Sequence, residues 1–331
     1  MIVKRIIKNS YNAIAILIIV TLLFSSCKSE RRIEENRIAM GTNVSITVFS
    51  QKDAKLLDDA FLLLSEIERK ISSKDPNSYV SKINSCASIS KVPVPDDVYS
   101  LIKRSVEIAN QTDGLFNPAI GALVDLWGIT TDNARVPEQY EIDAVLPLLS
   151  CSDIVFDDSL KTVYLKKKGM KLDLGAIGKG YAVDKLREYF LSNGVEKAII
   201  NLGGNVYVLG WKNKIEREKW RVGIVDPLAQ SNMLTEVDIM NKAVSTSGGY
   251  ERYFESDGIR YHHILSSATG YPTDSDALSA TVISPDGALA DALSTAAFSG
   301  GSEKAKELSE KFSVYIIIYT KSNQILRFGE L

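Results

Sequence analysis

The sequence contains few of the residues that make covalent cross-links or transition-metal centres. Three cysteines and two histidines occur among its 331 residues. Three thiols are too few for a disulfide scaffold, and the two adjacent histidines have no cysteine nearby, which argues against a zinc site. Lys and Arg number 39 against 41 Asp and Glu, so no basic excess indicates nucleic acid as a partner. Because repeats and low-complexity tracts are also absent, we expect a chain that is folded nearly throughout after its N-terminal segment.

The first 36 residues have the pattern of a lipoprotein signal and tether. A basic start precedes an apolar run over residues 13–24, which is too short to cross a bilayer comfortably, and two serines then lead to Cys27. We therefore predict a signal peptide over residues 1–26, lipid on Cys27 and a tether over residues 27–36. The protein would be a lipid-anchored membrane protein of the bacterial cell envelope, facing the periplasm or the exterior. A plain signal anchor is the alternative, and the early polar break after Ser25 disfavours it.

The rest of the chain alternates between strand and helix patterns. Residues 38–49 alternate as a strand, and residues 53–72 have an apolar face with helical spacing. Strand patterns separated by short turns fill residues 197–284, and two small-residue helices follow at 288–299 and 302–312. Further strands are expected at 154–156, 162–165, 170–174 and 314–319. The pattern predicts an α+β fold with largely antiparallel sheets flanked by helices, not a doubly wound parallel sheet.

Residues 172–184 form the most distinctive segment, in which an apolar run breaks into three glycines and a lysine. Gly175, Gly178 and Gly180 would let backbone N–H groups approach an anion, and a helix that starts near Ile177 would direct its positive end to the same point. Lys179 adds a full charge. The spacing matches neither the dinucleotide fingerprint nor the Walker A loop. A glycine-rich turn with a solvated lysine is the alternative.

Asp291 and Thr295 stand four residues apart, so they share one face of the predicted helix. A carboxylate and a hydroxyl in this arrangement suit a hard cation such as Mg²⁺, which keeps some of its water or substrate oxygens. The alternative is an ordinary helical aspartate, with a threonine that bonds to the previous turn.

Both histidines lie in residues 261–265, which have a strand pattern. Strand alternation sends His262 and His263 to opposite faces, so only one of them is expected to reach a site. A histidine near neutrality could act as a general base or position a phosphate, or it could be structural.

Several shorter motifs could either be ordinary turns and core or make room for a flat ligand. Glycine and hydroxyl residues at 201–205 and 245–250 suit tight hairpin turns or a bound phosphate. Methionine and aromatic residues at 40–42, 112–117 and 126–128 could pack on a flat ring system or belong to the core.

Taken in order along the chain, these motifs resemble the ApbE family, the FAD:protein FMN transferases. The resemblance rests on Met-Gly-Thr at 40–42, Thr-Asp-Gly-Leu-Phe-Asn at 112–117, the glycine segment, Asn-Leu-Gly-Gly-Asn at 201–205, Ser-Thr-Ser-Gly at 245–248 and Ala-Asp-Ala-Leu-Ser-Thr-Ala at 290–296. It runs from about Met40 to the C-terminus. It implies one ApbE-like, T-fold-like domain of two lobes over residues 37–331.

The resemblance also implies which residues form the site. It assigns flavin binding to Met40, Leu115, Phe116, Asn117, Asp173, Lys179 and Ile264. It assigns Mg²⁺ binding to Ala176 (through its carbonyl), Asp291 and Thr295, with Ser294 next to them. Asp291 would thereby serve catalysis, and His263 would help to deprotonate the acceptor.

The implied reaction is the Mg²⁺-dependent transfer of FMN from FAD to a threonine hydroxyl of an exported or membrane flavoprotein, with release of AMP. Two alternatives use the same features. A Mg²⁺-dependent FAD pyrophosphatase would use water as the nucleophile and release FMN and AMP. A non-catalytic FAD-binding lipoprotein would need no metal pair, so the presence of Asp291 and Thr295 argues against it.

Two positions depart from the family pattern. Lys74 stands where many relatives carry an aromatic residue, so a stacking contact with the flavin or adenine would be absent or replaced by a charge contact. Ser266 and Ser267 stand where relatives commonly have Asp-Pro. This second departure is expected to affect the loop before Thr269 and Gly270 more than the metal site.

Overall fold

The computed structural model describes residues 31–50 and 55–331. The predicted signal peptide, Cys27 and the first part of the predicted tether lie outside these residues. Within them, no helix has both the length and the apolar content that crossing a bilayer requires.

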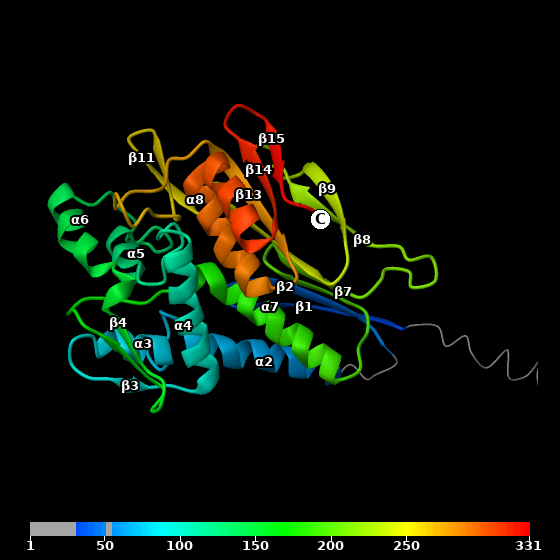
Figure 1. Cartoon of the computed structure of the whole chain (residues 1–331), viewed down its shortest axis with the longest axis horizontal. Coiled ribbons are helices and arrows are strands. Elements are labelled where there is room, and N and C mark those ends of the chain that lie inside the picture. Colours follow the sequence, from blue (N-terminus) through cyan, green and yellow to red (C-terminus); the bar gives the residue numbers. More distant parts are fainter. Residues whose placement is uncertain (1–30, 51–54) are drawn as a thin grey trace, which may run out of the picture.

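An eight-stranded sheet, antiparallel at every neighbouring pair, extends through the larger part of the molecule (Figure 1). Its strands, in spatial order, are β1 (Arg32–Ala39), β2 (Thr42–Phe49), β6 (Ala198–Leu202), β7 (Asn205–Leu209), β10 (Lys242–Gly248), β13 (Ala277–Ser284), β14 (Tyr315–Thr320) and β15 (Ile325–Phe328). The predicted α+β class with antiparallel sheets is therefore confirmed.

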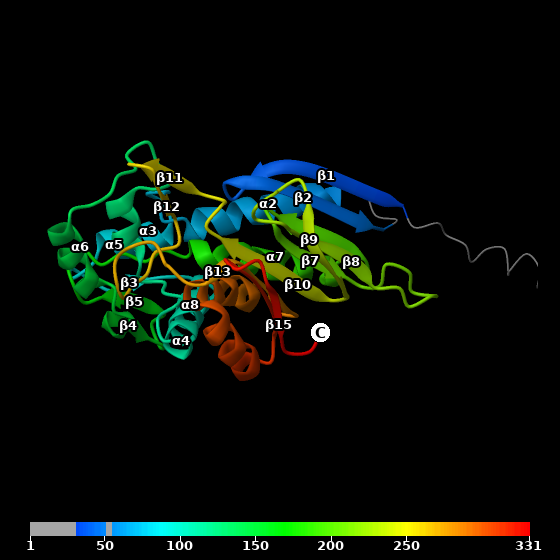
Figure 2. The same ribbon diagram turned by 90° about the horizontal axis from the view of Figure 1, so that it is seen from above.

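The two faces of this sheet are covered differently. Three helices pack on one face: α2 (Lys55–Ile71), α7 (Gly175–Ser192) and α8 (Gly287–Phe312). A separate hairpin of β8 (Trp220–Val225) and β9 (Met233–Ile239) covers part of the other face. Trp220 and Ile239 of this hairpin pack against Val208, Val244 and Ile317 of the main sheet. Figure 2 shows the hairpin beside β7 and β10.

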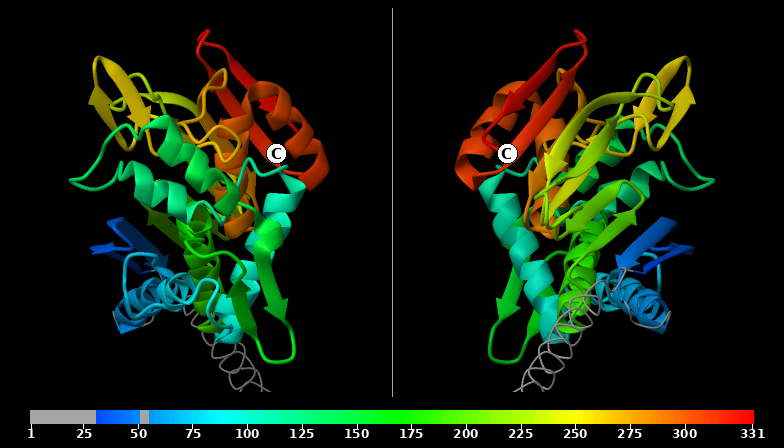
Figure 3. Two further views of the ribbon diagram at one scale, coloured as in Figure 1. Left: turned by 90° about the vertical axis from the view of Figure 1, so that its left-hand side faces the viewer. Right: turned by 90° about the vertical axis from the view of Figure 1, so that its right-hand side faces the viewer.

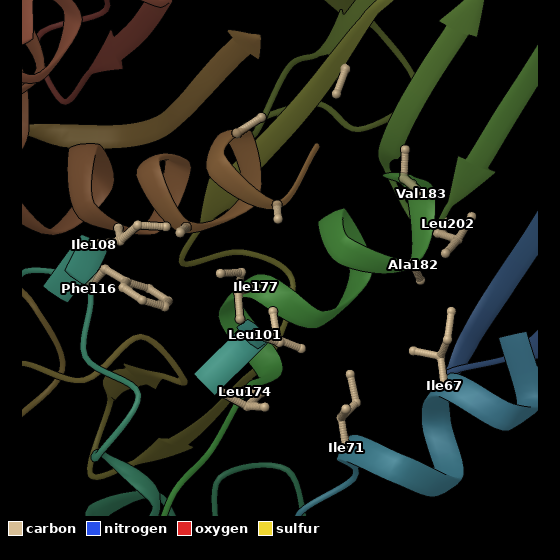
Figure 4. Close-up of a cluster of buried hydrophobic side chains, with 14 of the residues drawn as sticks. Ile67, Ile71, Leu101, Ile108, Phe116, Leu174, Ile177, Ala182, Val183 and Leu202 are labelled. Atoms are coloured by element: carbon tan, nitrogen blue, oxygen red, sulfur yellow. The ribbon is translucent and has the colours of Figure 1, made fainter. Parts of the chain in front are cut away.

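A second lobe lies beside the sheet, on the left of Figure 1. It contains α3 (Tyr79–Ser85), α4 (Asp96–Gln111), α5 (Gly121–Trp127), α6 (Gln139–Val145), the 3₁₀ turns η1 (Leu146–Leu148) and η2 (Cys151–Asp153), the small sheet of β3 (Val92–Pro93), β5 (Thr162–Leu165) and β4 (Ile154–Asp157), and the hairpin of β11 (Tyr253–Ser256) and β12 (Ile259–His262). The lobes share one apolar core, in which Ile71 of α2, Leu101 of α4 and Ile177 of α7 come together (Figure 4).

Helices α7 and α8 cross with their backbones in contact. A Cβ on Gly180 would lie 2.1 Å from the carbonyl oxygen of Gly287, and a Cβ on Gly287 would lie 2.7 Å from that of Gly180. Beside this crossing, the Asp184 carboxylate accepts hydrogen bonds from the N–H groups of Gly287 and Ala288, both at 2.9 Å. Asp184 thus satisfies donors at the start of α8 that have no partner within the helix.

The sequence pattern predicts one strand over residues 38–49, but the structure has two strands there, β1 and β2, and the first begins earlier in the chain. Residues 32–36, part of the predicted tether, belong to β1 and pair with β2. Met40 and Gly41, with φ of +51° and +67°, form the turn between the two strands. The prediction failed because β1 is a charged edge strand: such charges protect an edge from pairing with other chains, but they hide its alternation.

A second difference concerns residues 170–174, which form no strand although Met170, Leu172 and Leu174 are buried. The Asn84 side chain bonds both the N–H and the carbonyl of Leu172, at 2.7 and 3.0 Å, in place of a neighbouring strand. The two predicted C-terminal helices are confirmed, because α8 consists of two helical segments separated by a break at Gly301, where φ is +73°.

Replacing Gly180 by alanine is expected to destabilise the fold, because the new methyl group would collide with the backbone of Gly287. The expected loss is about 1–3 kcal/mol of unfolding free energy. Gly178→Ala is the matched control: its Cβ would meet only Cδ1 of Ile71, at 3.2 Å, and alanine is the better helix former by about 1 kcal/mol. Urea denaturation followed by circular dichroism measures both variants. Equal stability of the two would contradict the role given to the crossing.

Candidate active site

A cleft of about 870 Å³ opens between the helices of the main sheet and the second lobe. Its walls come from segments far apart in the sequence, including the β1–β2 turn, the start of α7, the end of β10 and α8. The predicted site residues that line it are Met40, Leu115, Phe116, Asn117, Asp173, Ala176, Lys179, His263, Ile264, Asp291 and Thr295. The fold therefore brings together nearly every residue assigned to the site by the sequence.

The glycine segment begins α7, but most of its first N–H groups already have partners in the protein. The helix starts at Gly175, whose N–H donates to the Asp173 carboxylate at 2.7 Å. The N–H groups of residues 177 and 178 both donate to the Leu174 carbonyl. The predicted anion cradle is wrong for Gly175 and Gly178, because the Asp173 carboxylate and the Leu174 carbonyl already accept hydrogen bonds from their N–H groups. Lys179, on the cleft wall, remains as a positive charge for an anionic ligand.

Asp291 is a carboxylate that is 5% exposed and borders the cleft. Its Oδ2 accepts from the N–H of Gly180 at 2.9 Å. In a regular helix that N–H would bond the carbonyl of Ala176, so Asp291 competes for the donor and favours a free Ala176 oxygen on the cleft wall. Thr295 lies one helical turn beyond Asp291, with Oγ1 3.2 Å from Oγ of Ser247.

This oxygen set fits Mg²⁺. A nearly buried carboxylate needs a compensating positive charge, and Mg²⁺ binds through one or two carboxylates together with neutral oxygens and substrate phosphates. The described residues contain no group of three His, Cys, Asp or Glu that could hold a metal without such help.

Ser294 is the predicted metal residue that does not reach the cleft. Its side chain is fully buried. Its hydroxyl donates to the backbone carbonyl of Asp291 at 2.8 Å and lies 2.8 Å from Oγ of Ser247. Because helical side chains three and four residues apart share a face, the sequence could not separate Ser294 from Thr295 by position alone. The structure gives Ser294 a positioning role, in which it holds Ser247 beside Thr295.

The two histidines have different environments, as the strand pattern predicted. His263 lines the cleft, and its Nδ1 lies 3.1 Å from the carbonyl oxygen of Arg252. A carbonyl can only accept, so Nδ1 carries the proton and Nε2 keeps a free lone pair. Burial lowers the pKa of His263 to about 4, which keeps the ring neutral at physiological pH.

His262 points away from the cleft and is structural. Its Nε2 lies 3.0 Å from the Thr273 carbonyl, and its Nδ1 accepts from the N–H of Ile264 at 3.3 Å. The ring also packs edge-on against Phe298. Both ring nitrogens are therefore occupied, and His262 has no lone pair left for catalysis.

In residues 115–117, which the sequence assigns to flavin binding, two of the three side chains are engaged within the protein. Phe116 is 2% exposed. The Asn117 amide bonds the Leu149 carbonyl and the Ala119 N–H at 2.9 and 2.8 Å. These two side chains fix the segment, which leaves Leu115 and the main chain to contact a ligand.

Comparisons with known proteins agree with this geometry. The sequence profile described as the ApbE family matches residues 40–318. The chain belongs to the ApbE family. A protein named FAD:protein FMN transferase from Treponema pallidum is 35% identical, covering 91% of this chain and 89% of that protein. A protein of the same name from Klebsiella pneumoniae is 38% identical, with coverage of 87% and 89%.

Solved structures of ApbE proteins have the same fold. The crystal structure of the ApbE protein from Thermotoga maritima superimposes with a TM-score of 0.84 at 37% identity, covering 90% of this chain and 97% of that one. The flavin transferase ApbE from Vibrio cholerae gives a TM-score of 0.81 at 25% identity, with coverage of 91% and 97%.

Sequence reasoning about this ApbE-family chain missed several cleft residues. Glu251 lines the cleft, where enclosure by the surrounding walls raises the pKa of its carboxyl group and the charges of Lys179 and Arg252 act against that rise. Glu68 accepts a hydrogen bond from the N–H of Met40 at 2.9 Å. The signal for Glu251 was its place directly after the 245–250 motif, whereas nothing in the spacing of α2 marks Glu68.

The two departures from the family pattern both have local partners. Lys74 lies on the cleft wall, and its Nζ donates to Oγ1 of Thr130 at 3.1 Å, so a charge is present where an aromatic ring was expected. Oγ of Ser266 accepts from the N–H groups of Ala268 and Thr269, each at 3.3 Å. The Ser266 hydroxyl thereby stabilises the loop much as an aspartate would.

We expect His263 to titrate far below an ordinary histidine, near pH 4, because burial disfavours its charged form. Between about pH 6.5, the ordinary pKa, and pH 4, the unfolded chain would bind a proton at this residue that the folded chain does not. Through this residue, stability should therefore fall as the pH drops through that interval. NMR titration of the ring resonances, assigned with a His262→Asn variant, measures the pKa. Titration of His263 near 6.5 would contradict its burial.

Proposed function

We propose that this ApbE-family protein transfers FMN from FAD to a threonine hydroxyl of an acceptor flavoprotein and releases AMP. The observation that carries the proposal is the convergence of Lys179, His263 and Asp291 on one cleft. The names of the relatives and their coverage of nearly the whole chain support the same reaction.

Some residues of the cleft would bind the flavin of FAD, and others would neutralise the charge of its phosphates. Lys179 supplies a positive charge for the diphosphate of FAD, since a fixed charge in a partly enclosed site stabilises the negative charge that develops on a leaving phosphate. Met40, Leu115 and Ile264 offer apolar contacts for the flavin ring. The volume of the cleft is in the range that encloses a ligand of this size.

In this mechanism His263 is the general base. Its neutral ring is oriented by the Arg252 carbonyl, and Nε2 accepts the proton of the acceptor threonine hydroxyl. The threonine oxygen then forms a bond to the flavin-side phosphorus. The bond from that phosphorus to the bridging oxygen breaks, and the bridging oxygen leaves with AMP.

The residues that would hold Mg²⁺ are Ala176, Asp291 and Thr295, for which the buried carboxylate is the main support. When bound, the ion would supply Lewis-acid charge neutralisation at the phosphates. Asp291 is the one anionic ligand of this set, so the affinity for the ion depends mainly on it.

A Mg²⁺-dependent FAD pyrophosphatase is the competing function, with water in the place of the threonine. The same cleft serves both reactions, because the acceptor lies on another chain. Chromatography of the products with and without acceptor distinguishes them: a transferase leaves FMN on protein, whereas a hydrolase leaves free FMN in both samples.

Incubation of the protein with FAD, Mg²⁺ and a flavin-free acceptor should give a covalent, fluorescent FMN adduct. Asp291→Asn keeps the size of the side chain and removes its charge, so turnover should fall by about 10²–10³-fold. Asp274→Asn is the control, because that carboxylate is exposed and pairs with Lys321 outside the cleft. Intact FAD with no adduct would contradict the proposed function, and full activity of Asp291→Asn would contradict the metal assignment.

We also propose that lipid on Cys27 anchors the protein to the bacterial envelope. The proposal rests on the basic start, the apolar run and the small residues before Cys27. In the native host, Cys27→Ser should move the chain from the membrane fraction to the soluble fraction or leave an uncleaved precursor. Immunoblots of fractionated cells show which occurs. An unchanged, fully processed membrane form would contradict lipid anchoring through this residue.

A further inference from the structure

The hairpin of β11 and β12 projects from the body of the molecule (Figure 3, yellow). Its first residue, Tyr253, lines the cleft. Asp257 and Gly258 form its two-residue turn, with φ of +51° and +76°. On its inner face, the rings of Phe254 and Tyr261 stack at 5.3 Å, and both pack on the buried Trp127. The hairpin is thus held firmly by the second lobe and does not depend on a neighbouring strand.

The register of the hairpin shows which backbone groups point away from it. Glu255 pairs with Arg260, and Tyr253 with His262. The pair that closes a two-residue turn is hydrogen-bonded, and bonded and non-bonded pairs then alternate. The bond from the His263 N–H to the Arg252 carbonyl, 3.0 Å, fits this alternation. Tyr253 and Glu255 therefore direct their N–H and carbonyl groups outward, and over residues 31–50 and 55–331 nothing bonds them.

Of the two edges of this hairpin, the β11 edge is the one that no other described segment covers next to the cleft. Next to the site, the chain that continues from β12 is already covered: the Thr273 N–H donates to the Ile264 carbonyl at 2.9 Å, and Leu265 forms a bridge with Pro272. On the other side, Tyr253 is 41% exposed and lines the cleft together with Arg252. An unprotected strand edge is unusual, because it invites pairing with another chain.

We propose that the acceptor protein binds by adding an extended segment to the β11 edge, which delivers its threonine to His263. This inference rests on the proposed function and names the part of the molecule that recognises the acceptor. Main-chain hydrogen bonds to Tyr253 and Glu255 would supply affinity, as in other cases of strand addition. In the acceptor segment, the threonine would lie two or three residues beyond the residue that pairs with Tyr253. At about 3.3 Å per residue, this is roughly 7–10 Å along the strand.

The exposed face of the hairpin favours a flat, apolar contact on that segment. The Arg260 guanidinium lies over the Tyr253 ring, 4.0 Å from its centroid, and also bonds the Glu255 carboxylate at 3.2 Å. Because the charges of Arg260 and Glu255 neutralise each other, this exposed face of the hairpin carries little net charge. An aromatic or aliphatic side chain of the acceptor, next to its threonine, would pack on Tyr253.

Proline substitutions test the edge directly, because proline removes an N–H and is tolerated where that N–H points away from the sheet. Glu255→Pro should raise the KM for the acceptor about tenfold, while FAD binding stays unchanged. Arg260→Pro is the matched control, since its N–H points outward from the opposite edge. Glu255→Ala and Arg260→Ala remove the side chains alone. The acceptor is the envelope protein of the host that loses an FMN-sized adduct when this gene is deleted, purified without flavin.

Hydrogen exchange provides a second measurement on the unaltered protein. Bound acceptor should slow exchange of the Tyr253 and Glu255 amides and leave those of residues 259–262 unchanged. An unchanged acceptor KM in a folded Glu255→Pro protein, or protection confined to residues 259–262 while FMN transfer proceeds, would overturn the proposal. Failure of the proposed function is distinguishable, because FAD would then bind without FMN transfer to any acceptor.

Discussion

The site depends on the close crossing of α7 and α8. Gly180 and Gly287 allow the two backbones to touch, and this approach places the Asp291 carboxylate against the N–H of Gly180. The same contact brings Ala176 and Thr295, from helices more than 100 residues apart in sequence, to one cleft. Asp184 maintains the crossing by capping the start of α8. A larger residue at position 180 would push the two helices apart. It would thereby separate the proposed metal-ligand oxygens, although the residues that carry them would be unchanged.

In the proposed mechanism, the second lobe supplies the base and the access to it. His263 follows β12 and is neutral because it is buried, while the Arg252 carbonyl fixes which nitrogen carries the proton. His262, one residue earlier, has both ring nitrogens in hydrogen bonds with the backbone of Thr273 and Ile264. In the proposed mechanism the two lobes have different roles: the helices of the main sheet would bind the phosphates and the metal ion, and the second lobe would carry out proton transfer.

Much of this site could be predicted from the sequence, because the motifs are local and their order is specific. The spacing of Asp291 and Thr295, the alternation of the two histidines and the apolar periods of the helices all depend on neighbours in the chain. The predictions that failed concern residues whose interaction partners are distant in the sequence. Asp173 occupies the helix end that the glycines were expected to offer to an anion. Ser294 is turned toward Ser247 of another element, and the strand character of β1 appears only when it pairs with β2.

A crystal structure with FAD and Mg²⁺ bound tests the central claim most directly. If the crossing of α7 and α8 builds the phosphate site, the diphosphate will lie between Lys179 and the pair of Asp291 and Thr295, with the ion at about 2.1 Å from an oxygen of Asp291. If the diphosphate lies elsewhere, or the ion binds without Asp291, the site has been assigned to the wrong part of the molecule.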